Sequence, residues 1–161
     1  MSTRSMADRK ILLRLDNEQA TRALAQALAP GLAAGLSVYL SGELGSGKTA
    51  LVRAMFAALG FDGKVKSPTY TIVEPYFIAG KAFYHFDFYR FADNMEWEDA
   101  GLREYFGGAN VCLVEWPEKA DGSIPAADWT INLRVLDEAA REVEIMTNSE
   151  FGRQCLQHTQ L

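Results

Sequence analysis

The order of apolar and polar residues predicts a strand and then a helix near the start of the chain. Lys10–Leu15 is a short, mostly apolar run of strand length. Asp16 can cap a following helix, with Gln19 three residues later returning the hydrogen bond. Pro30 and Gly31 would end this helix, because neither residue favours a helix interior. Between these limits apolar residues recur at helical spacing, at Ala20, Leu24, Ala27 and Leu28.

A second strand and a second helix flank a glycine-rich turn. Leu36–Ser41 has the apolar character of a buried strand. Gly42–Gly47 then forms the turn, and Lys48–Leu59 is predicted to be a helix that Gly60 closes. The turn is therefore expected to join the end of a strand to the beginning of a helix.

The middle of the chain is rich in β-branched and aromatic residues. Thr69–Tyr76 and Lys81–Arg90 are predicted to be two strands joined by a turn that ends in Gly80. Glu96–Phe106 is predicted to be helical, and Val111–Glu115 is an apolar run that ends in an acid.

The last strands are predicted to form an antiparallel pair. Trp129–Val135 alternates apolar and polar residues, and Val143–Met146 can pair with it across the polar turn at Asp137–Ala140. The tail Thr147–Leu161 carries no motif and is expected to be a short helix or disordered. Helices that alternate with buried strands predict an α/β sheet with antiparallel pieces.

Length and composition predict one acidic, soluble domain. The chain has 161 residues, and 16 Lys plus Arg against 21 Asp plus Glu give a net charge of −5, which argues against a stand-alone DNA or RNA binder. Two cysteines are too few for a disulfide framework or a zinc site. Because no run resembles a signal peptide or a membrane span, a cytoplasmic protein without a membrane partner is expected. A single domain over residues 1–161 is expected, with 1–9 and 148–161 as flexible tails.

The glycine-rich turn fits the phosphate-binding pattern G-x-x-x-x-G-K-[ST], known as the P-loop. The residues that fit it are Gly42, Glu43, Leu44, Gly45, Ser46, Gly47, Lys48 and Thr49. Phosphate oxygens need several inward-pointing backbone N–H groups, which a compact glycine-rich turn before a helix supplies. Lys48 can then reach the β and γ phosphates, and the Thr49 hydroxyl can hold Mg²⁺. The motif predicts a nucleotide-binding site.

Two carboxylates are candidates for work on the metal and on the attacking water. Glu115 follows four apolar residues, which is the Walker B arrangement, and Asp87 ends another apolar run. Carboxyl ends of neighbouring strands face the same crevice as the P-loop in such folds. The N-K-x-D signal for guanine is absent, so ATP is the expected nucleotide.

Motifs outside the P-loop resemble those of one family. They are Val65–Thr71 with the sequence V-K-S-P-T-Y-T, His85–Arg90 with H-F-D-F-Y-R, and Leu113–Pro117 with L-V-E-W-P. In this order they are similar to the TsaE family, formerly YjeE, of bacterial ATPases needed to make threonylcarbamoyladenosine in tRNA. The resemblance covers about Leu15 to Met146. It implies a P-loop nucleoside-triphosphate hydrolase fold, with a central, mostly parallel sheet that includes antiparallel strands and is flanked by helices.

The resemblance also implies roles for individual residues at the catalytic crevice. Lys48 would bind phosphate, and Thr49 and Glu115 would hold Mg²⁺. Asp87 would lie beside Glu115 as a further catalytic residue. Trp116 matches the tryptophan that follows the acid in the family.

Other matched positions are expected to sense or contact the nucleotide. Ser67, Pro68 and Thr69 match a switch-like segment, in which Thr69 would sense the γ-phosphate. Glu18 in the first helix and Arg141 in the late strand pair match positions expected to contact the nucleotide.

Two residues depart from the form that many relatives carry. Glu43 replaces an aspartate and keeps its charge, so little consequence is expected. Ala50 replaces a threonine and removes a hydroxyl that could bond the α-phosphate. Backbone N–H groups would then make this contact alone, and the free energy of nucleotide binding is expected to weaken by about 1 kcal/mol.

The family resemblance implies protein partners. TsaD transfers the threonylcarbamoyl group and TsaB bridges to it, and a TsaE-type ATPase would act while docked on this pair. The tRNA would be held mainly by the partners, which an acidic chain without a basic stripe can tolerate.

Two other functions remain open at this point. A small-molecule kinase would have the same P-loop. A nucleotide-gated binding module would use ATP only to order the segment Ser67 to Tyr70 for a partner. For His85 the sequence predicts packing or a hydrogen bond, since a metal site would need companion ligands.

Overall fold

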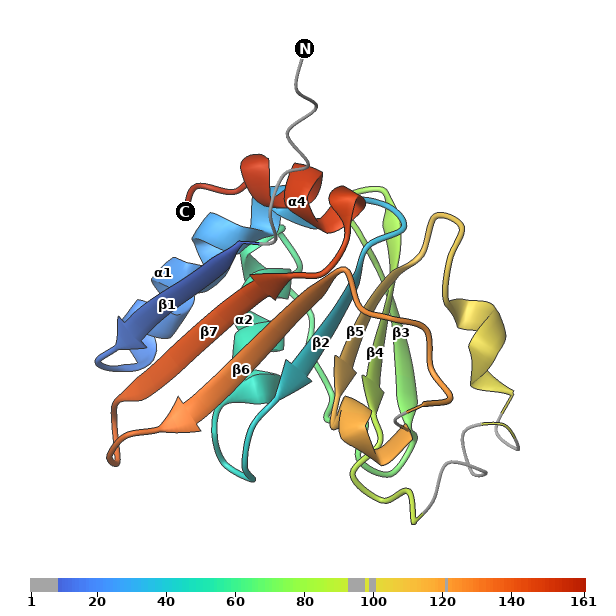
Figure 1. Cartoon of the computed structure of the whole chain (residues 1–161), viewed down its shortest axis with the longest axis horizontal. Coiled ribbons are helices and arrows are strands. Elements are labelled where there is room, and N and C mark those ends of the chain that lie inside the picture. Colours follow the sequence, from blue (N-terminus) through green and yellow to red (C-terminus); the bar gives the residue numbers. More distant parts are fainter. Residues whose placement is uncertain (1–8, 93–97, 99–100, 121) are drawn as a thin grey trace.

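The computed structural model describes residues 9–92, 98, 101–120 and 122–161. Within these residues seven strands form one sheet in the order β1-β7-β6-β2-β5-β4-β3 (Figure 1). The strands are β1 (Lys10–Leu15), β2 (Ser37–Ser41), β3 (Val73–Ile78), β4 (Lys81–Asp87), β5 (Val111–Glu115), β6 (Trp129–Val135) and β7 (Arg141–Thr147). The helices are α1 (Glu18–Leu28), α2 (Lys48–Ala58) and α4 (Glu150–Gln157), with short 3₁₀ turns η1 (Ala29–Gly31), η2 (Leu102–Tyr105) and η3 (Pro117–Ala120).

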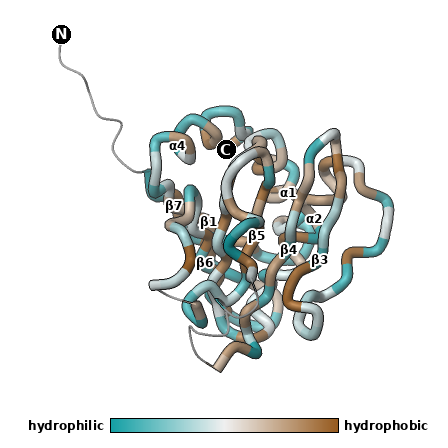
Figure 2. Tube along the Cα trace, turned by 90° about the vertical axis from the view of Figure 1, so that its right-hand side faces the viewer, coloured by the Kyte–Doolittle hydropathy of each residue, from teal (hydrophilic) through white to brown (hydrophobic). Residues whose placement is uncertain are grey.

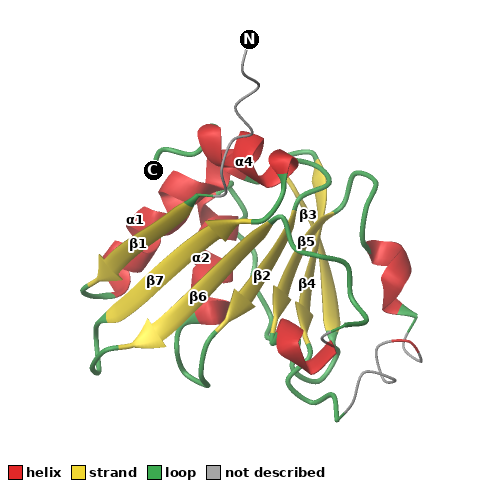
Figure 3. Ribbon diagram, viewed as in Figure 1, coloured by secondary structure: helices red, strands yellow, loops and turns green. Residues whose placement is uncertain are grey.

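The sheet is mixed, as the sequence predicts. Its centre is parallel, because β6 pairs with β2, β2 with β5, and β5 with β4 in the parallel sense. Both margins are antiparallel, through β1 with β7, β7 with β6, and β3 with β4. The arrowheads of β6, β2, β5 and β4 therefore lie at one end of the sheet, where the P-loop runs from β2 into α2 (Figure 3). This end is the usual place for a ligand in an open α/β sheet.

One face of the sheet packs against α1 and α2, which lie side by side behind it in Figure 1. Helix α2 contributes Leu51, Val52, Met55 and Phe56, all fully buried, and the central strands contribute alternate residues such as Val38, Leu40, Leu113 and Ile131. Figure 2 shows hydrophobic segments recurring along the strands in the interior. Burial of this apolar surface is the main force that holds the P-loop helix against the sheet.

The other face is covered by irregular chain and 3₁₀ turns from residues 101–110, 116–120 and 122–127. Here the strand residues of opposite parity, including Tyr39, Phe86 and Val114, pack with Leu102, Phe106 and Ile124. The rings of Phe86 and Phe106 stack at 5.2 Å. The sequence predicted helices beside the sheet. In the part of the chain that the structure describes, α1 and α2 cover one face, and the other face is covered mainly by irregular chain.

The start of α1 differs by one residue from the predicted cap. Asn17, not Asp16, is the cap, because its side-chain oxygen accepts from the N–H of Ala20 at 2.9 Å. Asp16 instead accepts from the guanidinium Nε of Arg14 at 2.8 Å. The pairing of Asp16 with Arg14 leaves the neighbouring Asn17 to satisfy the free N–H groups of the first helical turn.

The segment predicted to be a strand from Thr69 begins as a turn instead. Ile72 donates its N–H to the carbonyl of Pro68 at 2.7 Å and has φ of 72°, so regular strand structure starts only at Val73. The strand prediction, which rested on β-branched residues, is therefore wrong for Thr69–Ile72. In the region predicted as the helix Glu96–Phe106, residues 96, 97, 99 and 100 lie outside the described residues, and the described part holds the 3₁₀ turn η2.

The C-terminal segment contains a helix, which is one of the two expected alternatives. Ser149 caps α4 by accepting from the N–H of Gly152 at 2.9 Å. The indole N–H of the buried Trp129 donates to the carbonyl of Gly152 at 2.8 Å, and Cys155 and Leu156 are buried. Helix α4 lies at the end of the sheet opposite the P-loop (Figure 1). Among the described residues, no helix is both long enough and apolar enough to cross a membrane.

Candidate nucleotide-binding and catalytic site

The P-loop is a compact turn between β2 and α2, as predicted. Gly42 has φ of 153°, and a Cβ there would lie 2.5 Å from both the Leu133 carbonyl and the Ser46 hydroxyl, so the turn has no room for a side chain. Gly47 has φ of 104°, in the region that favours glycine, and it precedes the first turn of α2. The loop therefore presents its backbone and the positive end of α2 to the same space.

The ammonium of Lys48 lies inside this turn. Its Nζ donates to the carbonyls of Gly42 at 2.6 Å and Glu43 at 3.0 Å, and it lies 4.3 Å from the centre of the Trp116 ring. Burial lowers the pKa of Lys48, and the carboxylate of Glu115 is the first of the nearby charges that oppose this. These carbonyls are uncharged acceptors, so the ammonium can exchange them for phosphate oxygens, which bind it more strongly because they are charged.

Glu115, at the end of β5, joins the P-loop to the sheet. Its two carboxylate oxygens lie 2.8 and 2.9 Å from Oγ1 of Thr49, the second residue of α2. Its Oε2 also lies 2.6 Å from Nε2 of His85 on β4. Glu115 is only 2% exposed, so this polar cluster lies at the floor of the site.

Asp87 stands beside Glu115, because the two residues are register partners at the ends of β4 and β5. Its carboxylate accepts from the N–H of Tyr89 at 2.8 Å and from the hydroxyl of Thr69 at 3.2 Å. The Thr69 hydroxyl lies 2.9 Å from that of Ser67. Burial raises the pKa of Asp87, and the hydrogen bond from Tyr89 acts in the opposite direction. The segment expected to be switch-like therefore contacts the second acid directly.

These groups line a cavity of about 350 Å³. Its lining includes the expected site residues Leu44, Gly45, Gly47, Lys48, Thr49, Thr69, Asp87 and Glu115, together with Ser67, Tyr89 and Trp116. The residues come from the P-loop, the segment before β3, and the ends of β4 and β5. Sequence reasoning placed the two acids and the loop at one crevice, and the structure brings them together there.

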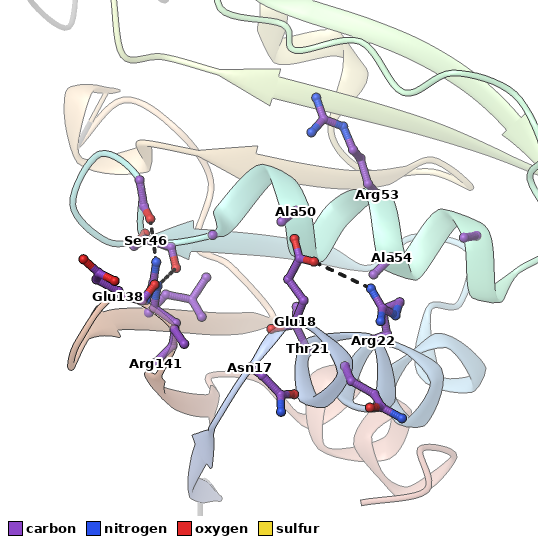
Figure 4. A pocket seen from close by; sticks show the side chains of 16 residues that line it. Asn17, Glu18, Thr21, Arg22, Ser46, Ala50, Arg53, Ala54, Glu138 and Arg141 are labelled. Atoms are coloured by element: carbon purple, nitrogen blue, oxygen red, sulfur yellow. Dashed lines mark hydrogen bonds and ion pairs between the residues drawn. The ribbon is translucent and has the colours of Figure 1, made fainter.

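A larger cavity of about 970 Å³ lies on the other side of the P-loop, between α1, α2 and the β6–β7 turn. Its lining includes the expected residues Glu18, Gly45, Ser46, Gly47, Ala50 and Arg141. Figure 4 shows Glu18 on α1 directed toward α2, close to Ala50 and Ala54. Glu18 also forms a long ion pair with Arg22 at 4.0 Å. Gly45 and Gly47 line both cavities, so the P-loop separates them.

Arg141, the first residue of β7, reaches across to the P-loop. Its guanidinium donates to the carbonyls of Ser46 at 3.1 Å and Gly45 at 3.3 Å (Figure 4). It also donates to the carbonyl of Asp137 at 2.8 Å in the β6–β7 turn. Arg141 therefore braces the loop against the hairpin, a role that the sequence did not indicate, and it lines the larger cavity as well.

The residues expected to hold Mg²⁺ fit that ion in their chemistry. Thr49 and Glu115 offer a hydroxyl and a carboxylate within hydrogen-bond distance of each other, and oxygen ligands are those that Mg²⁺ prefers. In the part of the chain that the structure describes, no group of three or more His, Cys, Asp or Glu residues converges to form a metal site.

Two aromatic residues also take part in the site: Trp116, which the sequence indicated only as a family match, and Tyr89, to which it assigned no role. Trp116 has φ of 57° and its ring faces Lys48, and Tyr89 packs on Trp116 with ring centres 5.0 Å apart. Both follow a predicted acid by one or two positions, so their place next to the acids was the available signal. His85 forms a hydrogen bond with Glu115, which is one of the two roles predicted for it from the sequence.

Comparison with known proteins matches this site to one family. The family model described as "Threonylcarbamoyl adenosine biosynthesis protein TsaE" matches residues 15–143. The chain belongs to the TsaE family. The matched range contains all the expected site residues, from Glu18 to Arg141, whereas α4 follows it.

Curated TsaE proteins are similar along most of their length. The TsaE protein of Haemophilus influenzae is 50% identical over 116 residues, which cover 72% of this chain and 73% of that protein. The TsaE protein of Bacillus subtilis is 36% identical over 127 residues, or 79% of each chain. Both are named tRNA threonylcarbamoyladenosine biosynthesis protein TsaE.

The fold of this TsaE-family chain also matches a solved structure. The crystal structure of YdiB from Bacillus subtilis superposes with a TM-score of 0.79 at 27% identity, and 95% of each chain is covered. This match confirms the expected P-loop fold. The fold is consistent with a nucleotide-binding protein.

Proposed function

We propose that this TsaE-family protein binds ATP with Mg²⁺ and hydrolyses it to ADP and phosphate. The observation that carries the proposal is the position of the P-loop between two cavities. One cavity is large enough for a nucleoside, and the other holds two carboxylates and two threonine hydroxyls. A nucleotide laid across the loop has its base and ribose on one side and its terminal phosphate on the other.

In this arrangement the P-loop and Lys48 bind the phosphates. The backbone N–H groups of Gly45–Lys48 and the N-terminus of α2 surround the phosphate oxygens, while Lys48 exchanges its contacts with Gly42 and Glu43 for phosphate. Glu18, Ala50 and Arg141 line the space for the nucleoside. At position 50 the backbone N–H replaces the hydroxyl that many relatives carry.

Thr49 and Glu115 are the proposed Mg²⁺ residues. When bound there, Mg²⁺ would neutralise the negative charge that develops on the phosphates. The hydrogen bond between the Thr49 hydroxyl and the Glu115 carboxylate holds both groups on the phosphate side of the loop. This leaves Asp87 as the acid available to the attacking water.

Asp87 is the proposed residue that orients this water. Burial raises the pKa of its carboxyl, which makes it a better proton acceptor near neutral pH. Thr69 donates to the same carboxylate, so the segment from Ser67 is positioned to respond when a γ-phosphate enters. Release of phosphate would then free the segment.

The proposed biological role is the formation of threonylcarbamoyladenosine in tRNA, as in the names of the curated relatives. The protein would act while docked on TsaD and TsaB homologues and contact tRNA only through that complex. Its net charge of −5 supports this arrangement, because the partners would then bind the RNA phosphates and the acidic chain would not have to.

The fate of the terminal phosphate distinguishes this proposal from a kinase. ATP labelled on the γ-phosphate is incubated with the protein, its partners and a metabolite extract. Free labelled phosphate that depends on the partners supports the proposal, whereas a labelled metabolite made without them overturns it in favour of a kinase.

A nucleotide-gated binding module is the second candidate, since Thr69 links the segment from Ser67 to Asp87. The test is tRNA modification with a non-hydrolysable ATP analogue in place of ATP. Several rounds of modification with the analogue would show that hydrolysis is dispensable and would replace the ATPase proposal by the module.

A further inference from the structure

His85 is a fully buried polar side chain on β4, which lies between β5 and the edge strand β3. It lies on β4, on the face that packs against α2, and its ring meets the ring of Phe56 edge-on at 6.5 Å between centres. Its register partner on β5 is Leu113, two residues before Glu115. His85 therefore lies diagonally across from Glu115 on the same face of the sheet, and its ring reaches the Glu115 carboxylate.

The hydrogen bond between His85 and Glu115 defines the tautomer of the ring. An ionised carboxylate only accepts hydrogen bonds, so Nε2, which lies 2.6 Å from Oε2 of Glu115, carries the hydrogen. Nδ1 is buried and has no hydrogen-bond partner among the residues that the structure describes. A hydrogen on Nδ1 would leave an unsatisfied buried donor, so Nε2 is the nitrogen that donates in this site.

Glu115 thus receives donors from two separate elements. Thr49 donates from α2, within the P-loop motif, and His85 donates from β4. Thr49 lies almost equally far from both carboxylate oxygens, at 2.8 and 2.9 Å, so this contact alone allows the carboxylate to tilt. The donor from His85 falls on Oε2 only and fixes the plane of the group.

We propose that His85 is a positioning residue, which orients the Glu115 carboxylate toward Thr49 and thereby sets how strongly Mg²⁺ promotes nucleotide binding. The proposal rests on the Mg²⁺-dependent nucleotide binding proposed above. Outer partners of metal-binding side chains commonly contribute about 10- to 100-fold to metal affinity. Since His85 has no exposed surface, it acts through Glu115 and not on the nucleotide itself.

Three substitutions separate this role from simple packing. His85→Leu removes both ring nitrogens. His85→Asn stays polar, but its amide is too short to reach the position of Nε2. His85→Gln can place an amide N–H near that position and donate to Glu115.

The measurement is the affinity for a non-hydrolysable ATP analogue, taken once with Mg²⁺ and once with a chelator. The ratio of the two affinities should fall by about 10-fold or more in His85→Leu and His85→Asn. In His85→Gln it should return to within about threefold of the original ratio. The affinity in chelator should be the same in all the folded variants, because His85 has no exposed surface for a nucleotide to contact.

Thr147→Val is the matched control. Thr147 is also a fully buried polar residue, but its hydroxyl accepts from the N–H of Arg9, away from the P-loop. Its loss should lower the unfolding temperature and leave the Mg²⁺ ratio unchanged. If His85→Leu does not fold, the contrast between the Asn and Gln variants gives the same answer.

The outcomes separate this proposal from the proposed function. Equal Mg²⁺ ratios in the original protein and in the folded His85 variants, with only the unfolding temperature lowered, would reduce His85 to a packing residue and leave the ATPase proposal intact. An original protein that does not bind the analogue would overturn both. An original protein that binds it equally well without Mg²⁺ would overturn the role of His85 and the metal, but not nucleotide binding.

Discussion

The hydroxyl of Thr49 donates to the Glu115 carboxylate, with its Oγ1 at 2.8 and 2.9 Å from the two oxygens, although the residues are 66 positions apart. The contact ties the first turn of α2 to the end of β5. Both groups belong to the site for which Mg²⁺ and the terminal phosphates are proposed. The same hydrogen bond therefore serves stability and, in our proposal, catalysis.

Replacing Thr49 by Val tests this double role. The variant keeps the volume of the side chain but leaves the buried Glu115 without one donor, so the free energy of unfolding should fall by about 1–3 kcal/mol. Mg²⁺-dependent ATP hydrolysis should be lost as well. Thr49→Ser keeps the hydroxyl and should preserve both properties, as measured by denaturant unfolding and phosphate release. Full activity in Thr49→Val would exclude the hydroxyl from the metal site.

Replacing Arg141 by Ala should weaken nucleotide binding through the shape of the P-loop. The guanidinium holds the carbonyls of Gly45 and Ser46, and loss of these bonds lets the loop rearrange. About a tenfold increase in the Kd for ATP is expected, which corresponds to roughly 1.4 kcal/mol. Calorimetric titration measures it.

The control for this variant is Arg134→Ala on the neighbouring strand. Arg134 pairs with Glu142 at 2.8 Å on an exposed surface, so its removal should change neither the Kd nor the stability appreciably. If the two arginine variants bind ATP equally well, Arg141 does not brace the loop.

The pH dependence of stability tests the environment of Asp87. Burial raises the pKa of this carboxyl in the folded chain, so its ionisation destabilises the fold at neutral pH. Asp87→Asn keeps an acceptor for Tyr89 and should therefore be more stable than the original chain at neutral pH. The difference should shrink as the pH falls through the folded-state pKa, since both chains are then neutral at this position. Asp87→Asn should also lose hydrolysis.

Asp137→Asn is the control of opposite sign. Hydrogen bonds from the N–H groups of Ala140 and Ala139 lower the pKa of Asp137, so ionised Asp137 stabilises the fold and this contribution is lost as the pH falls. Its amide variant should be slightly less stable than the original chain at neutral pH. Urea unfolding between about pH 2 and pH 8 extends below the ordinary carboxyl pKa near 4, where the contribution of Asp137 is lost, and up to neutrality. Parallel curves for the two variants would contradict the assigned environments.

Replacing Trp129 by Phe tests the anchoring of α4. The variant loses the hydrogen bond to the carbonyl of Gly152 and leaves that buried acceptor without this donor. The free energy of unfolding should fall by about 1–3 kcal/mol, with ATP binding unchanged, because α4 lies at the far end of the sheet. Phe77→Leu, at a side chain 76% exposed on β3, should change stability by less than about 0.5 kcal/mol. A Trp129 variant as stable as this control would show that α4 is not anchored there.

The sequence predicted the parts of the site that depend on local structure. The P-loop is a continuous motif, and Val111–Glu115 is a buried strand with its acid at the end, so both could be recognised without knowledge of the sheet order. The predictions that were wrong also concern local structure. Asn17 rather than Asp16 caps α1, and the turn at Ile72 interrupts a β-branched run, because hydrogen bonds with Ala20 and Pro68 outweigh local propensity.

The remaining contacts depend on pairings between distant segments. Arg141 reaches the P-loop because β6 pairs with β2 and carries the β6–β7 hairpin alongside. His85 reaches Glu115 because β4 pairs with β5 in one particular register. Hydrophobic periodicity indicates which residues are buried, but it does not give the order or the register of strands. These two contacts could therefore be found only in the folded structure.

The central claim is that ATP is hydrolysed at the P-loop crevice, and phosphate release by the Lys48→Ala variant tests it most directly. Lys64→Ala, at an exposed position, is the control. With TsaD and TsaB homologues present, the original protein and the control should release phosphate from ATP at the same rate. Lys48→Ala should be slower by at least about 100-fold while keeping its fold by circular dichroism. A folded Lys48→Ala variant that releases phosphate at the original rate would contradict the account.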